Sequence, residues 1–90
     1  MPNTAANYNK KEVSINYTET EEGRNRKFTV QVTDPIFERE FPRPFDLVYM
    51  PNPVGSGYVW DYTSTDIKDV GFINQVMVAL EEVAIFKTRQ

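Results

Sequence analysis

The sequence predicts an α+β fold: an antiparallel sheet of about four strands, arranged as two hairpins, with one C-terminal helix packed on one face. Two early segments alternate apolar and polar residues with the period of a β-strand. The last third of the chain instead repeats apolar residues with the period of a helix. The 90 residues suit one domain, and we expect an N-terminal arm or tail over residues 1–11 and a single domain over residues 12–90.

Residues 12–18 and 26–33 predict the first hairpin. Apolar side chains take every second position in both runs: Val13, Ile15, Tyr17, Phe28, Val30 and Val32. The polar segment between the runs contains Gly23 and Asn25, which tolerate the positive φ of a tight turn. Acidic residues lie beside this turn, with Arg24 and Arg26 nearby, and we expect them to form a solvated hairpin tip: Glu19, Glu21 and Glu22.

Residues 46–50 and 58–63 predict the second hairpin, because the loop between them contains two prolines and two glycines. Its second strand places an aromatic row on one face, with Tyr49 across the hairpin: Tyr58, Trp60 and Tyr62. Such a row either packs on the sheet or binds a protein partner, since Tyr and Trp are favoured interface anchors.

The connector between the two predicted hairpins begins at Asp34-Pro35, which ends the preceding strand because proline removes a backbone donor. Residues 41–45 read Phe-Pro-Arg-Pro-Phe and must be extended, because a residue before proline avoids the α region. This stretch is either a rigid cover for the sheet edge or a docking peptide that presents Phe41, Arg43 and Phe45 to a partner.

The helix is predicted to begin within residues 64–69, with Ser64, Thr65 or Asp66 as the cap, and to run to about Phe86. Its main apolar stripe is expected to pack on the sheet: Val70, Ile73, Val76, Met77, Leu80, Val83 and Ala84, extended by Phe72, Ala79 and Phe86. A second stripe projects to another side and is either covered by a loop or forms an oligomer or partner interface: Ile67, Val78 and Ile85.

The composition excludes several kinds of chemistry. The chain has no cysteine and no histidine, so thiolate zinc sites, disulfides and histidine-dependent catalytic triads cannot form. Asp61, Asp66 and Asp69 lack the spacing of a calcium loop, and helix capping explains them better. We therefore expect no cofactor, no metal and no enzymatic activity, although a carboxylate-dependent enzyme is not excluded.

These observations predict a non-catalytic protein-binding or accessory subunit that acts through apolar and aromatic surfaces in a larger complex or oligomer. The alternative is a small acidic inhibitor that blocks an enzyme's nucleic-acid or substrate site by charge mimicry. Residues 46–90 hold three basic and six acidic residues, so direct nucleic-acid binding is not expected. The sequence shows no signal peptide and no membrane span, so we expect a soluble, cytoplasmic protein without a membrane or small-molecule partner.

Overall fold

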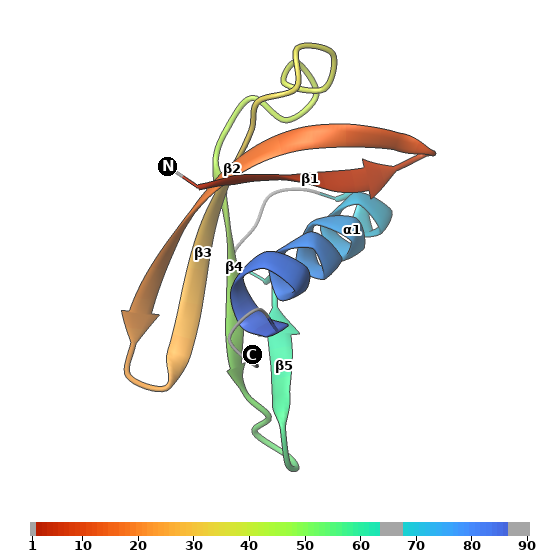
Figure 1. The fold of residues 1–90 in the computed structure, drawn as a ribbon. Coiled ribbons are helices and arrows are strands. Elements are labelled where there is room, and N and C mark those ends of the chain that lie inside the picture. The colour runs from red at the N-terminus through yellow and green to blue at the C-terminus, as the bar shows by residue number, and fades with distance from the viewer. Residues whose placement is uncertain (1, 64–67, 87–90) are drawn as a thin grey trace.

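The computed structural model describes residues 2–63 and 68–86 and has the predicted α+β architecture (Figure 1). Within these residues, one antiparallel sheet holds five strands in chain order: β1 (Asn3–Tyr8), β2 (Lys11–Glu22), β3 (Asn25–Val32), β4 (Phe45–Pro51) and β5 (Tyr58–Asp61). Helix α1 (Val70–Leu80) follows, and a π-helical turn, η1 (Glu81–Ile85), extends it. The sheet curls around α1, which lies against its inner face (Figure 1).

The sheet has one strand more than predicted, because residues 3–8 form β1. This segment pairs along the first half of β2, and Ala6 is completely buried opposite Val13. Asn9 and Lys10 join the two strands in a two-residue turn, and both have the positive φ that such a turn requires. Asparagines, threonine and two alanines give β1 too weak an alternation for sequence reasoning to detect.

Both predicted hairpins are confirmed. β2 pairs with β3 and β4 pairs with β5, and an additional β3–β4 pairing joins the two hairpins into one sheet. The side chains predicted to alternate lie on the inner face and are all buried, Tyr17 being the most exposed of them at 8%. The outer face is mostly polar, and there the Thr29 hydroxyl donates a 2.8 Å hydrogen bond to Asp46.

Helix α1 packs on the sheet mainly by its predicted stripe, since Ile73, Val76, Met77 and Leu80 are buried. Val70, which the prediction also placed on this stripe, is about half exposed, whereas Phe72, which was expected to extend the stripe, is completely buried. Val78 is exposed, as the second stripe requires, but Ile85 is partly buried and packs against the core. Val78 and Ile85 differ because η1 has more residues per turn than an α-helix, which rotates Ile85 back toward the sheet. Ile67 lies outside the described residues.

The contacts of the Phe72 ring explain the orientation of α1. Phe41 from the connector stacks on it with 4.3 Å between ring centroids and 4° between ring planes. Tyr8 of β1 and Phe45 of β4 make edge contacts with the same ring, at 5.3 and 6.4 Å. Segments far apart in sequence therefore meet on one helical side chain, and the connector closes this end of the core.

Asp69 begins the helix, and Tyr8 holds it in place. The Asp69 carboxylate accepts a 3.1 Å hydrogen bond from the Phe72 amide and a second hydrogen bond from the Tyr8 hydroxyl. The hydrogen bond from Tyr8 and the backbone contact lower the pKa of Asp69, and the same bond to Asp69 raises the pKa of Tyr8. The cap is therefore Asp69; the predicted cap residues, Ser64, Thr65 and Asp66, lie outside the described residues.

Replacing this cap tests its contribution. We expect Asp69→Ala to lower the free energy of unfolding by about 1 kcal/mol at neutral pH, the usual effect of losing a side-chain N-cap. The pKa of Asp69 in the folded protein lies below its ordinary value, so the ionised carboxylate stabilises the fold. This stabilisation is fully present above the pKa of Asp69 in the unfolded chain, and it is lost as the pH falls through the folded pKa. Urea unfolding of both proteins at pH 7 and pH 3 should show the difference shrinking in acid. An equal difference at both pH values would contradict the charge argument.

Candidate functional site

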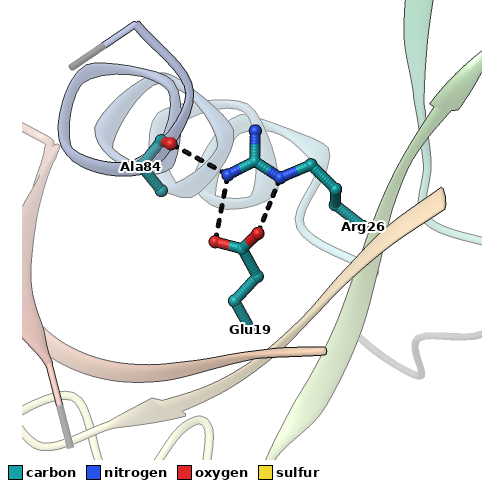
Figure 2. Close-up of polar contacts among 3 residues, drawn as sticks. All are labelled: Glu19, Arg26 and Ala84. Atoms are coloured by element: carbon teal, nitrogen blue, oxygen red, sulfur yellow. Dashed lines mark hydrogen bonds and ion pairs between the residues drawn. The ribbon is translucent and has the colours of Figure 1, made fainter. Parts of the chain in front are cut away.

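Arg26 joins the end of the helical segment to the sheet (Figure 2). On the inner face, its Nε and Nη2 donate hydrogen bonds of 2.6 and 3.0 Å to the two carboxylate oxygens of Glu19 on β2. Nη2 also donates a 2.9 Å hydrogen bond to the carbonyl of Ala84 in η1. A cation placed here satisfies a carbonyl at the negative end of the helical segment.

This arrangement changes the prediction of a solvated acidic tip only at Glu19, since Glu21 and Glu22 are exposed as expected. The side chains of Glu19 and Arg26 are each only 27% exposed. The hydrogen bond that Arg26 donates to Glu19 raises the pKa of Arg26, whose guanidinium also lies 5.7 Å from the centre of the Phe28 ring. By contrast, Glu22 forms a looser 3.4 Å ion pair with Lys27 and is 56% exposed. Sequence reasoning missed the Glu19–Arg26 pair, although the positions of the two residues flanking a predicted hairpin turn could have suggested it.

Aromatic rings cover the inner face of the β4–β5 hairpin. Tyr49 and Tyr58 stack with 5.1 Å between ring centroids and 13° between planes, and Trp60 lies 5.0 Å from Tyr49. Trp60 also contacts Phe28 in the core, at 5.6 Å, and its indole Nε1 donates a 3.3 Å hydrogen bond to Glu81. The row therefore runs from the core, at Trp60, to the surface, at Tyr58.

The loop of this hairpin presents an apolar side chain to solvent. Val54 is 93% exposed and Tyr58 is 46% exposed. The amide of Val54 donates to the side chain of Asn52, and the amide of Asn52 donates to the carbonyl of Gly57, whose positive φ of 80° suits glycine. The hairpin extends beyond the end of the helical segment (Figure 1), so its loop projects from the body of the domain.

The predicted site residues do not form one site. Phe45 is buried and Phe41 is partly buried in the aromatic cluster around Phe72, whereas Arg43 between them is exposed. Trp60 is partly buried and packed against the core, whereas Tyr58 and Tyr62 are exposed. Sequence reasoning did not single out Val54. Its place between Pro53 and Gly55 in a predicted turn nevertheless indicated an apolar side chain exposed to solvent.

Asp61 and Asp69, the described acidic residues near the helix start, each accept hydrogen bonds from nearby groups. The Asp61 carboxylate accepts hydrogen bonds from the amide and hydroxyl of Thr63, which lower its pKa, while Asp69 caps the helix. Asp66, the third residue considered from the sequence, lies outside the described residues. In residues 2–63 and 68–86, no three acidic side chains are placed to hold a metal ion, and no helix has the length and apolar character to cross a membrane.

Similarity to other proteins provides no assignment for this domain. Comparisons with protein-family models, curated proteins and solved structures find no match to the chain. An assignment of function must therefore come from the exposed side chains and the charges described above.

A double-mutant cycle tests whether the Arg26 contacts stabilise the fold. We expect Glu19→Gln and Arg26→Met to be coupled by about 1 kcal/mol in the free energy of unfolding, because the pair is bidentate but partly solvated. The coupling should decrease in high salt. Glu22→Gln is the matched control, and should change stability by less than about 0.5 kcal/mol because its ion pair is exposed. Equal effects of Glu19→Gln and Glu22→Gln would contradict a distinct role for Arg26.

Proposed function

We propose that this chain is a non-catalytic protein-binding module, an accessory subunit that contacts its partner through the β4–β5 hairpin. The contact surface, called the hairpin surface below, consists of Tyr49, Val54, Tyr58 and Tyr62. We also propose that the protein acts in the cytoplasm and binds neither nucleic acid nor a small molecule directly.

The main support is the stacked pair of Tyr49 and Tyr58 beside the highly exposed Val54. The stack restrains Tyr58, and the hydrogen-bonded loop restrains the backbone around Val54, so little conformational entropy remains to be lost on binding. Rigid, partly exposed tyrosines are the side chains that most often anchor protein interfaces. Neither the stack nor the loop requires Val54 to be apolar, so contact with a partner would explain an apolar side chain at this exposed position.

The alternative of charge mimicry has less support, because about half of the acidic side chains are paired within the chain. At least seven of the thirteen carboxylates accept hydrogen bonds or ion pairs within the chain: Glu19, Glu22, Asp34, Asp46, Asp61, Asp69 and Glu81. A mimic of nucleic acid needs such groups free and gathered on one face. The carboxylate-dependent enzyme also lacks support, since in residues 2–63 and 68–86 the two acids with a shifted pKa, Asp61 and Asp69, both have a lowered pKa.

Affinity capture from the native host tests the proposal with matched variants. The hairpin variant combines Val54→Asp with Tyr58→Ala, and the control is Val78→Asp on the exposed side of α1. We expect a protein captured by the wild type to be retained by the control and reduced roughly tenfold or more by the hairpin variant, as for the loss of an aromatic anchor.

Two outcomes would contradict the proposal, provided that thermal melts show all three proteins folded. Equal capture by the hairpin variant and the wild type would remove the hairpin from the interface. Loss of capture by Val78→Asp alone would instead assign the interface to the exposed side of α1, as the prediction of a second helical stripe suggested.

A further inference from the structure

We infer that two copies of this chain exchange β1, so that the strand Asn3–Tyr8 of each copy pairs with β2 of the other. The partner is therefore a second copy, and its β1 occupies the place beside β2 that β1 fills in Figure 1. No residue of the hairpin surface takes part, so the exchange is independent of the proposed function.

The turn between β1 and β2 is the hinge of this exchange. It consists of Asn9 and Lys10 alone, with φ values of 53° and 64°. Asparagine tolerates this left-handed backbone, but Lys10 takes the second position of the turn, which usually belongs to glycine. An extended hinge relieves the strain at both residues, and an exchanged dimer contains two such hinges. A short turn under strain is the kind of connection that favours strand exchange.

The surface that receives β1 is already present in the folded chain. All six residues of β1 pair with β2, and Ala6 is completely buried. The ring of Tyr8 makes edge contacts with Phe37 and Phe72 at 5.9 and 5.3 Å, and its hydroxyl donates to Asp69. Each of these contacts depends on where β1 lies and not on which copy supplies it. The complementarity of the exchanged contact is therefore the complementarity that the structure shows within one chain.

The position of β1 in the fold permits the exchange. β1 is the first of the five strands and lies at an edge of the sheet, and among residues 2–63 and 68–86 the only strand that pairs with it is β2. Its removal leaves the other four strands paired in the same order. Ala6 and Tyr8 hold β1 in the folded molecule, so copies exchange it while they fold together at high concentration.

Co-refolding of two single-cysteine chains tests the exchange. The sequence contains no cysteine, and Ala5 of β1 lies directly opposite Ser14 of β2, within reach of a disulfide. The Ala5→Cys and Ser14→Cys chains are unfolded in urea, refolded together at a total concentration of about 1 mM, and oxidised. We expect a disulfide-linked heterodimer on a non-reducing gel, because an exchanged β1 places the two cysteines of different chains opposite each other.

The matched control uses the same two chains, refolded separately and mixed before oxidation. It should give only the background of linked dimer that each chain gives alone, since closed monomers keep β1 on their own β2.

Sedimentation velocity of turn variants tests the role of Lys10, with all samples refolded at the same concentration and followed until they no longer change. Lys10→Gly removes the strain of the closed turn, so its association constant should be at least about tenfold lower than that of the wild type. Lys10→Val should raise the constant, because a β-branched residue disfavours positive φ. Lys11→Val makes the same change one residue later, within β2, and should leave the constant unchanged.

The opposing results overturn the inference. Absence of the heterodimer after co-refolding would show that β1 closes only on its own chain. An equal yield of heterodimer in the separately refolded control would show a contact between closed monomers. A dimer that is unchanged in both Lys10 variants would exclude the turn as the hinge. The cysteine experiment keeps the wild-type turn, so it decides the question even if a turn variant fails to fold.

Discussion

The ring of Phe72 is the contact on which the rest of the structure depends. It is completely buried and touches β1 through Tyr8, the connector through Phe41 and β4 through Phe45. A small domain has a modest core, so one side chain that joins several segments has a large share of the packing. The position of this ring sets the rotation of α1, and the rotation leaves Val78 outside the core.

Polar contacts hold both ends of the helical segment against the inner face of the sheet. Tyr8 binds the N-cap Asp69 at one end, and Arg26 binds the Ala84 carbonyl at the other. Each contact comes from a strand that lies far away in the sequence. The curled sheet and the helix are therefore fixed to each other at both ends, and the β4–β5 hairpin extends past them with its tyrosines partly exposed (Figure 1).

The sequence predicted the elements whose pattern is strong and local. The alternation around Val13 and Phe28 gave the first hairpin, and the prolines and glycines after Met50 gave the second. β1 escaped prediction because its stability comes from pairing with β2 and from the burial of a small side chain, Ala6. Neither effect leaves a periodic signal in the sequence.

The surface residues were harder to predict, because their exposure depends on long-range packing. Phe41 and Phe45 flank Arg43 symmetrically in the sequence, yet the contacts with Phe72 bury both rings to different degrees and leave the arginine outside. Ile85 was placed by regular helical spacing, which η1 interrupts.

Native-state hydrogen exchange tests the central role of Phe72 most directly. If Phe72 joins β1, the connector and β4 to one unit, the hydrogen-bonded amides of β1 and α1 should exchange through one common opening. Exchange of the β1 amides orders of magnitude faster than those of α1 would contradict this account.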